Sequence, residues 1–351
     1  QPPRGDRDRH AVVTAAPLPT PAGPLDLAAE LLGSATDVVL LAHSGPDADA
    51  LGSALAVGLA LRARGAQVVV SFGDEPFAVP RSLAWLPGVD DLVRPPAAVP
   101  ASPQVAAAFD TSSPDRLGVL RPLVSGAGSF VVVDHHGAGE EFGDVAVIDV
   151  AAPATALLVL DLLDRMGAPL TPDIATCLYA GLLTDTGGFR FAATTAATHR
   201  AAARLHEAGV RHDEVARLIY DDEPFAVLRL LGAALDAAVI EPDALGGLGL
   251  VRTTVDAESR RALGLPLDAV ERVIDTLRVA GEAEVALVLK QDDAGRWRVS
   301  TRSKGGLDVG RACRGLGGGG HRFAAGATLD GSAEAVLADV RAALAASLEA
   351  G

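Results

Sequence analysis

The side chains best suited to chemistry are histidines and aspartates that follow apolar runs. Val38 to Ala42 is such a run and predicts a buried strand, with His43 at its carboxyl end. Asp47 and Asp49 follow in a Gly-Pro loop, just before an Ala/Leu-rich helix. Ligands of open α/β sheets bind at the carboxyl ends of strands, and one imidazole with two carboxylates supplies half of a hard-metal site. The alternative is that Asp49 caps the helix and Asp47 makes a turn.

Three further groups of the same kind occur where predicted elements end. They are Asp110, the run Asp134, His135 and His136, and Asp185. Carboxylates and imidazoles without a thiolate suit Mn²⁺ or Mg²⁺ better than structural zinc. More than four such ligands indicate two ions that share a bridging carboxylate. Two ions ~3.5–4 Å apart activate a water and hold phosphoryl oxygens in phosphoester hydrolysis.

Strands and helices that alternate along the chain must position these groups. Strands are predicted at 38–42, 67–72, 104–109, 130–133 and 145–150, and helices at 25–32, 50–64, 154–166 and 172–183. This alternation predicts an α/β fold with a parallel sheet flanked by helices. In the second half, strands are predicted at 248–255, 284–290 and 297–301, and helices at 268–279, 309–314 and 332–348. The predicted parts are a disordered extension (1–24), a first domain (25–194), a helical connector (195–237) and a smaller α/β domain (238–351).

The composition limits the class of protein and its partners. The 351 residues carry a formal net charge of −15, and a field of that sign repels long nucleic acid. Cys177 and Cys313 lie far apart in unrelated contexts, which predicts a reduced, cytoplasmic protein. No apolar run reaches the ~18 residues of a membrane span, so no membrane contact is predicted.

The four acidic and histidine motifs together resemble those of the DHH phosphoesterase superfamily. The matching text is His-Ser-Gly-Pro-Asp-Ala-Asp-Ala-Leu-Gly-Ser at 43–53, Phe-Asp-Thr-Ser at 109–112, Val-Asp-His-His at 133–136 and Thr-Asp-Thr-Gly-Gly-Phe-Arg-Phe at 184–191. Thr-Arg-Ser-Lys at 301–304 and Gly-Gly-Gly-Gly-His at 317–321 resemble the associated DHHA1 domain. The resemblance runs from about residue 26 to the end. It is strongest to the nanoRNase/pAp-phosphatase type, whose actinobacterial members also degrade cyclic dinucleotides.

The resemblance implies a role for each motif residue. One Mn²⁺ ion would be held by His43, Asp47 and Asp110, and the other by Asp49, Asp110, His135 and Asp185. Mg²⁺ is the alternative metal. Asp110 would bridge the ions, Asp134 would orient His135, and His136 would contact the scissile phosphate. The alternative for His136 is a structural hydrogen bond. The first domain would be catalytic and the last would bind substrate.

A second set of residues is predicted to bind phosphate in the last domain. Five cations lie between Arg302 and Arg322, and only Asp308 opposes them. A glycine run lets backbone N–H groups approach a phosphate closely, although such a run is more often a flexible turn. Together with the resemblance, these features predict a binding set made of Arg302, Ser303, Gly318, Gly319, Gly320 and His321.

These observations predict a Mn²⁺-dependent hydrolase of short nucleotides. The substrates expected from the resemblance are nanoRNA, the dinucleotide pApA, 3′-phosphoadenosine 5′-phosphate (pAp) and cyclic di-AMP. A pyrophosphatase, a RecJ-like exonuclease on long single strands and a non-catalytic nucleotide sensor are the alternatives. The glycine run and histidine argue against the first, the acidic charge against the second and the intact ligand set against the third. Ala and Leu on helices 154–183 predict a homodimer that pairs through a helical face.

Overall fold

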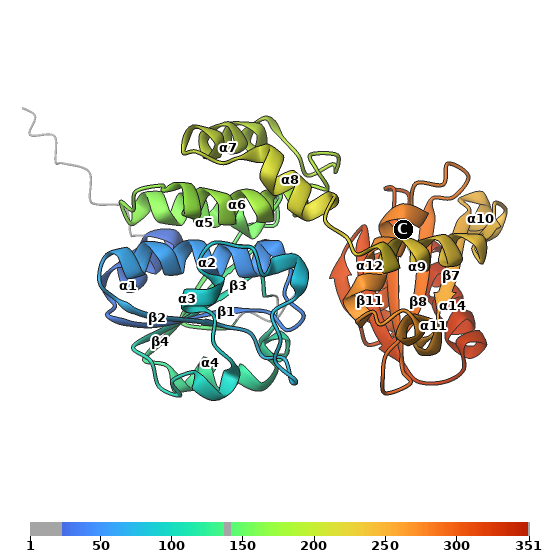
Figure 1. The fold of residues 1–351 in the computed structure, drawn as a ribbon, viewed down its shortest axis with the longest axis horizontal. Helices are drawn as coiled ribbons and strands as arrows, with labels where there is room; N and C mark the ends of the chain where they lie inside the picture. Colours follow the sequence, from blue (N-terminus) through green and yellow to red (C-terminus); the bar gives the residue numbers. More distant parts are fainter. Residues whose placement is uncertain (1–22, 112, 137–141, 350–351) are drawn as a thin grey trace, which may run out of the picture.

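The computed structural model describes residues 23–111, 113–136 and 142–349. Two α/β units follow one another along the chain and are joined by helices (Figure 1). The predicted extension, 1–24, lies outside the described residues except for its last two positions, where the first helix begins. None of the helices in the described ranges combines the length and hydrophobicity that a membrane span needs.

The first unit is built on a parallel sheet of five strands in the order β2-β1-β3-β4-β5. The strands are β1 (Asp37–Ala42), β2 (Gln67–Ser71), β3 (Val105–Phe109), β4 (Ser129–Asp134) and β5 (Val145–Ile148). Each lies within a residue or two of its predicted range. β1, β3 and β4 are buried along almost their whole length, because helices cover both faces of a parallel sheet.

Helices form two layers on one face of this sheet (Figure 1). They are α1 (Pro24–Ser34), α2 (Ala48–Ala63), α5 (Thr155–Arg165) and α6 (Pro172–Asp185). α2 lies between the sheet and α6, and it is buried on nearly every side. At Gly52 a β-carbon would lie 2.5 Å from the carbonyl oxygen of Cys177, so only glycine permits this approach of the two helices. The other face is covered by η3 (Pro114–Leu120) and α4 (Leu123–Gly126).

The crossover between β2 and β3 contains only short pieces of helix. They are η1 (Arg81–Leu83), α3 (Val89–Leu92) and η2 (Pro96–Ala98). The rest of this crossover, between β2 and β3, is loop.

The helical surface that was predicted to pair in a homodimer is instead buried within the chain. Most apolar residues of α5 and α6 are buried against α2, the sheet and each other. They therefore leave no broad apolar face on these two helices. The large exposed hydrophobic side chains in the described ranges include Phe225, Leu228 and Ile240, which belong to later elements.

The segment predicted as a connector is helical and divides between the two units. α7 (Ala196–Glu207) and α8 (His212–Tyr220) pack on α6, whereas α9 (Phe225–Asp236) packs on the second sheet. Two arginines hold the turn between α8 and α9. Arg81 of the first unit contacts the Asp222 carboxylate at 2.9 Å, and Arg272 of the second donates to the Tyr220 carbonyl at 2.6 Å.

The second unit is a mixed sheet of six strands in the order β10-β11-β9-β8-β7-β6. The strands are β6 (Val239–Glu241), β7 (Leu250–Val255), β8 (Val285–Gln291), β9 (Trp297–Ser303), β10 (Gly319–His321) and β11 (Ala324–Leu329). The helical segments are α10 (Ala244–Gly247), α11 (Ala257–Ala262), η4 (Leu267–Val270), α12 (Glu271–Leu277), α13 (Val309–Gly315) and α14 (Ala333–Glu349). β6, β10 and β11 were not predicted from the sequence, because they contain glycine and alanine or are very short.

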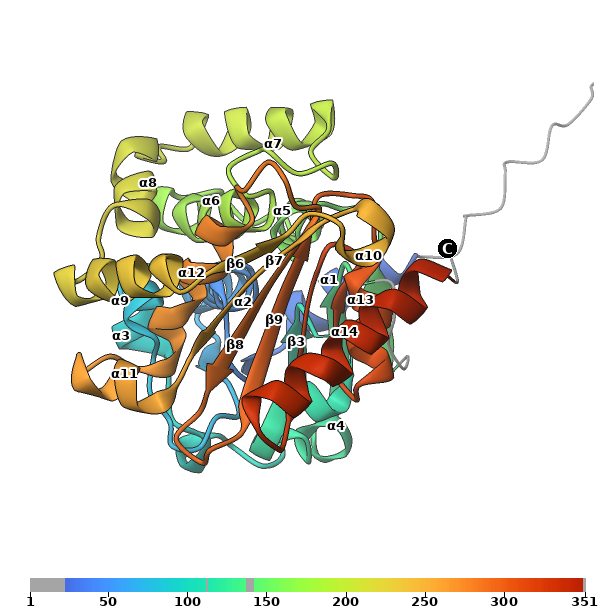
Figure 2. The same ribbon diagram turned by 90° about the vertical axis from the view of Figure 1, so that its right-hand side faces the viewer.

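The two faces of the second sheet are covered to different extents. α13 and α14 cover one face, and α9 and α12 lie on the other (Figure 2). The α9 and α12 side chains pack on β7 and β8. On that same face β9, β11 and β10 carry Arg302, Ala324 and His321, and His321 reaches the first unit.

Candidate active site

The acidic and histidine residues meet at the carboxyl edge of the first sheet. The strand order reverses between β1 and β3, which is where open α/β sheets bind their ligands. His43 directly follows β1, Asp110 directly follows β3, and Asp134 ends β4. Asp185 ends α6 and reaches the same edge from the helical layer. The structure therefore brings together the residues of the predicted metal set, which are spread over 143 positions of the sequence.

The turn before α2 gives its two aspartates different tasks. One oxygen of Asp47 accepts the N–H groups of Asp49 and Ala50, each at 3.0 Å, and so caps the helix. The other oxygen lies 3.6 Å from Nε2 of His43. Asp49 is fully buried, with its carboxylate directed toward the start of α5. The alternative from the sequence placed the cap of this helix at Asp49, whereas Asp47 makes it and Asp49 faces α5.

His43 and His135 each direct one ring nitrogen at two carboxylates. Nε2 of His43 lies 3.6 Å from Asp47 and 3.5 Å from Asp110. Nε2 of His135 lies 3.3 Å from Asp110 and 3.3 Å from Asp185. Oδ2 of Asp110 faces His43, and its Oδ1 faces His135. This carboxylate therefore lies between two groups of possible ligands.

The other ring nitrogen of each histidine is held by a backbone carbonyl. Nδ1 of His43 donates to the oxygen of Ser44 at 2.9 Å, and Nδ1 of His135 donates to that of Ala152 at 3.1 Å. These bonds set the tautomer and leave Nε2 free to act as a ligand. Both Nε2 atoms are buried and have no hydrogen-bond partner. A divalent cation would satisfy both nitrogens and the carboxylates around them, so the residues fit the metals that the family resemblance implies.

Electrostatics support the same interpretation. Burial opposes the positive charge on His43, but the Asp110 and Asp47 carboxylates outweigh it and raise the His43 pKa to about 10. For His135, burial is outweighed by Asp110 and Asp185, and the pKa rises to about 12. Burial, and then Asp185 and Asp110, raise the pKa of Asp49. The metal-free cluster thus retains protons to balance its negative charge, and cations can replace them.

Asp134 does not orient His135, contrary to the expectation from the resemblance. Its Oδ1 lies 2.7 Å from Nδ1 of His136 and 3.2 Å from the His136 backbone nitrogen. Asp134 and His136 are two positions apart, so their side chains reach the same side, whereas His135 points away toward Ala152. Asp134 is therefore the partner of His136, and the Ala152 carbonyl is the partner of His135.

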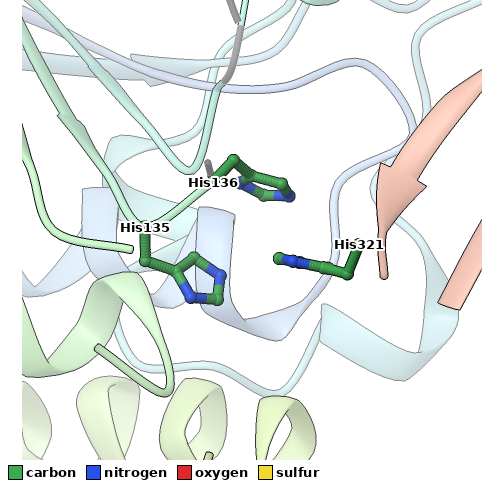
Figure 3. Close-up of side chains that lie close together, drawn as sticks. All are labelled: His135, His136 and His321. Atoms are coloured by element: carbon green, nitrogen blue, oxygen red, sulfur yellow. The ribbon is translucent and has the colours of Figure 1, made fainter. Parts of the chain in front are cut away.

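His321 of the second unit lies directly against the histidines of the first (Figure 3). Its ring stacks on that of His136, with centroids 4.1 Å apart and an angle of 19° between the planes. The centroid of His135 is 4.9 Å away. Partial burial, and then the neighbouring His136 and His135 rings, lower the pKa of His321 to about 4. The three histidines thus form one cluster that spans both units.

Arg302 belongs to the same row of the second sheet as His321. Arg302 pairs with Ala324, and Ala324 pairs with His321, so the three side chains share one face. Two strand spacings separate Arg302 from His321, or roughly 10 Å. Its Nη1 donates to the Thr301 carbonyl at 3.1 Å, and its Nε lies 3.8 Å from the Asp275 carboxylate. Arg302 therefore lies beside the histidine cluster rather than within it.

Ser303 has a structural role instead of the predicted substrate-binding one. It is 3% exposed, and its hydroxyl donates to Glu284 at 2.8 Å while accepting the N–H groups of Gly305 and Leu307 at 3.2 Å. Because β-strand side chains alternate, Ser303 points away from the face that carries Arg302. Lys304, another cation of the predicted patch, donates to a backbone carbonyl within its own domain.

The glycine run is required mainly by the approach of β10 to β11. A β-carbon at Gly318 would lie 2.1 Å from the oxygen of Gly326, and one at Gly320 would lie 2.6 Å from that of Ala324. Gly320 also has a φ of 128°, which favours glycine. A β-carbon at Gly317 or at Gly319 meets nothing within 4 Å, but the φ of 76° at Gly317 favours glycine, so Gly319 is the position of the run that accepts a side chain without strain.

Sequence reasoning missed Thr155, which contacts two residues of the predicted metal set. Its hydroxyl donates to Asp110 at 3.0 Å, and its N–H donates to Asp49 at 2.6 Å. A threonine at the start of an apolar helix is a common N-terminal signal. That signal explains the helix but contains no information about the two distant aspartates.

Comparisons with known proteins agree with this geometry. The sequence profile of the DHH family, N-terminal domain, matches residues 37–182, and that of the DHHA1 domain matches 260–349. The bifunctional oligoribonuclease and PAP phosphatase NrnA of Thermus thermophilus is 36% identical over 308 residues, which cover 87% of this chain and 88% of the relative. The probable enzyme of the same name from Streptococcus mutans is 27% identical, with 83% and 88% covered.

Two further comparisons are more distant. The cyclic-di-AMP phosphodiesterase GdpP of Geobacillus thermodenitrificans is 27% identical over 86% of this chain, but this match spans only 46% of GdpP. An exopolyphosphatase-related protein from Bacteroides fragilis has the same fold, with a TM-score of 0.82, 23% identity, and 93% of this chain and 97% of that chain covered. The chain belongs to the DHH family in its nanoRNase type with a C-terminal DHHA1 domain, and it is a hydrolase of phosphoester bonds.

Proposed function

We propose that this enzyme is a Mn²⁺-dependent phosphodiesterase and phosphatase of short nucleotides. Its substrates would be nanoRNA, dinucleotides such as pApA, and pAp, with cyclic di-AMP as a further candidate. The observation that carries the proposal is the histidine cluster, in which His321 of one unit stacks on His136 of the other. The names of the relatives, which include oligoribonuclease, PAP phosphatase and cyclic-di-AMP phosphodiesterase, support the same substrate class.

Two groups of residues would hold the metal ions. His43, Asp47 and Asp110 form one group, and Asp49, Asp110, His135 and Asp185 form the other. When bound, two such ions lower the pKa of a coordinated water and neutralise charge on phosphoryl oxygens. Mn²⁺ is favoured over zinc because every ligand is a carboxylate or an imidazole. Mg²⁺ remains the alternative metal.

The protein's own groups would bind and orient the scissile phosphate. Asp134 holds the ring of His136 through Nδ1, which leaves Nε2 available to the substrate. His321 lies at the same place, so both histidines would contact the same phosphoryl group. This differs from the prediction made from the sequence, which placed His321 in a second phosphate-binding set, apart from the metal residues.

Arg302 would bind the far part of the substrate. It stands two strands from His321 on the same face, roughly 10 Å away. A dinucleotide can reach both places, whereas a long strand must pass a protein with a net charge of −15. The proposal therefore favours a nanoRNase over a RecJ-like exonuclease. In this scheme residues 25–194 are catalytic, residues 195–237 connect the domains and residues 238–351 bind substrate.

One comparison of substrates tests the proposal. The metal-free protein is loaded with Mn²⁺ and assayed on pApA, pAp, cyclic di-AMP, pyrophosphate and a twenty-nucleotide single strand. We expect pApA and pAp to be hydrolysed most efficiently and chelator to abolish activity. Preference for pyrophosphate or for the long strand would replace the proposal with one of those activities. Nucleotide binding without turnover would indicate a sensor.

Two other expectations stay predictions. A cytoplasmic location follows from the cysteine usage alone. A homodimer is expected, although the helices first predicted to pair are buried within the chain. Light scattering at micromolar protein concentration measures the mass directly, and a monomer mass would contradict the prediction.

A further inference from the structure

The N-terminus of α5 lies against the predicted metal set. Ala154 occupies the N-cap position and offers no side-chain cap. The Asp49 carboxylate, which belongs to α2, takes that place. It accepts the N–H of Thr155 at 2.6 Å and that of Ala156 at 2.8 Å. α5 is therefore capped by a side chain from a different helix, α2. The same two hydrogen bonds satisfy the buried carboxylate of Asp49.

Thr155 makes a second contact in the same place. Its Oγ1 donates to Oδ1 of Asp110 at 3.0 Å. Thr155 and Asp49 are fully buried, and Asp110 is 2% exposed. Water cannot replace these bonds easily in such a site, so each bond restricts the carboxylate that accepts it.

The backbone of Asp110 has an unusual conformation, and hydrogen bonds hold both its main chain and its carboxylate. Its φ is 56°, a region that residues other than glycine rarely occupy. Its backbone N–H donates to Val133 at 3.0 Å, which continues the β3–β4 pairing and sets the main chain. The Thr155 hydroxyl donates to Oδ1, the oxygen that also lies 3.3 Å from Nε2 of His135 and 3.5 Å from Nδ1 of His136. The rotation of the Asp110 carboxylate is thus set from outside the predicted ligand set.

We infer that Thr155 is a positioning residue that fixes Asp49 and Asp110 relative to each other, and through them the two metal positions. One residue acts on both carboxylates, through its backbone N–H on Asp49 and through its hydroxyl on Asp110. The inference rests on the proposed function, because it assumes that these carboxylates bind metal. Residues that orient metal ligands typically change metal affinity by about 10- to 100-fold when removed.

The test compares variants that differ in the hydroxyl group. Thr155→Val keeps the shape and the backbone N–H but loses the donor to Asp110. Thr155→Ser keeps the donor and loses only a methyl group. Mn²⁺ binding to each metal-free protein is measured by titration calorimetry. We expect Thr155→Val to bind about 10- to 100-fold more weakly, Thr155→Ser to bind like the wild type, and activity of the Val variant to recover largely at saturating Mn²⁺.

Thr253→Val is the matched control. Thr253 is 3% exposed in the second unit, and its hydroxyl donates to the Ala234 carbonyl at 2.7 Å. The control therefore loses a buried hydrogen bond of the same kind, far from the candidate site. We expect it to lower the melting temperature without changing Mn²⁺ affinity, which separates positioning from general destabilisation.

The outcomes separate failure of this inference from failure of the proposed function. If the wild type binds no Mn²⁺, the proposed metal site is wrong. If the wild type binds Mn²⁺ and Thr155→Val binds it equally well, only the role of Thr155 is wrong. Should the Val variant not fold, Thr155→Ala and Thr155→Ser form the decisive pair, because they differ only in the hydroxyl. Equal Mn²⁺ affinity of these two would overturn the inference.

Discussion

The edge of the first sheet and the open face of the second sheet collect polar residues in different ways. At the edge, His43, Asp110 and Asp134 come from separate strand ends and are almost completely buried. On the face, Arg302 and His321 come from strands in register and keep part of their surface exposed. A parallel sheet brings distant residues to one point, whereas neighbouring antiparallel strands space residues at fixed intervals. The first arrangement suits chemistry at one phosphorus atom, and the second suits the selection of substrates by their length.

The two regions also differ in how much each residue depends on its neighbours. Each buried carboxylate at the edge faces a histidine or a helix N-terminus, so the removal of one leaves others unpaired. On the face, Arg302 donates to the backbone carbonyl of its neighbour Thr301 at 3.1 Å, and its only contact with a carboxylate is a long one, 3.8 Å to Asp275. We therefore expect substitutions at the edge to affect every substrate and substitutions on the face to affect some.

The largest expected effect is that of Asp110→Ala. Both oxygens of Asp110 face histidines, so its loss disturbs both metal groups. Breaking a buried charge network costs about 3–5 kcal/mol, and kcat/KM should fall by about 10²- to 10³-fold or more for every substrate. Asp91→Ala removes an exposed aspartate and serves as the control. Full occupancy of both ions in the Asp110 variant, measured by anomalous scattering, would contradict the bridging role.

The comparison becomes sharper with His321→Ala and Arg302→Ala. Loss of a charge-assisted hydrogen bond of roughly 1.5–3 kcal/mol reduces kcat/KM by about 10- to 150-fold. We expect His321→Ala to slow pApA and bis-p-nitrophenyl phosphate alike, because His321 lies against His136. Arg302→Ala should slow pApA and spare the small ester.

Arg298→Ala is a suitable control for that pair of variants. Arg298 lies on the same strand and face as Arg302, four residues away, and contacts Asp292 at 3.5 Å. It should leave both rates unchanged. If His321→Ala spared the small ester, His321 would act at a distant phosphate after all.

A smaller effect separates the glycines of the second sheet. Gly318→Ala places a methyl group against the β11 backbone, and overpacking of this kind costs about 1–3 kcal/mol. Gly319→Ala meets open space, so the fold should keep its stability. Thermal denaturation measures both variants. Unchanged stability with weakened pApA binding in Gly319→Ala would show that its backbone lies at the substrate, whereas equal destabilisation of both variants would contradict the packing argument.

The remaining effects concern pH and the metal-free edge. The folded pKa of His43, about 10, exceeds the unfolded value of 6.5. The charged ring therefore stabilises the folded state fully below pH 6.5, and this contribution is lost as pH rises through about 10. In chelator, the melting temperature should fall between pH 7 and pH 10. His43→Gln should show a shallower fall, and an identical slope in both proteins would contradict the raised pKa.

Metal should reverse that pH dependence. Bound cations replace the protons on His43 and His135, so protons and metal compete. The stabilisation by Mn²⁺ should therefore increase from pH 7 to pH 8.5, which a series of melting curves at fixed free Mn²⁺ measures. A decrease over that range would argue against these histidines as ligands.

Much of the first unit followed from periodicity alone. Buried parallel strands are uninterrupted apolar runs, so β1, β3 and β4 stood out together with the polar residue at the end of each. That placement was enough to predict His43, Asp110 and Asp134 at one edge of one sheet. β10 and β11 escaped prediction because glycine and alanine provide no apolar alternation. Their pairing depends on β9 and on the space above Gly318 and Gly320.

The sequence by itself determined which residue types end the strands, and therefore that an acidic and histidine cluster forms at the carboxyl edge. Only the tertiary structure decided which partner each side chain takes. Asp134 binds His136 rather than His135, Ser303 turns into the interior, and His321 reaches across to the first unit. The physical reason is that strand ends are specified by local hydrophobicity, whereas hydrogen-bond partners depend on side-chain direction and on the packing of segments far apart in the chain. Thr155 shows this most directly, because its contacts to Asp49 and Asp110 span 106 and 45 positions of sequence.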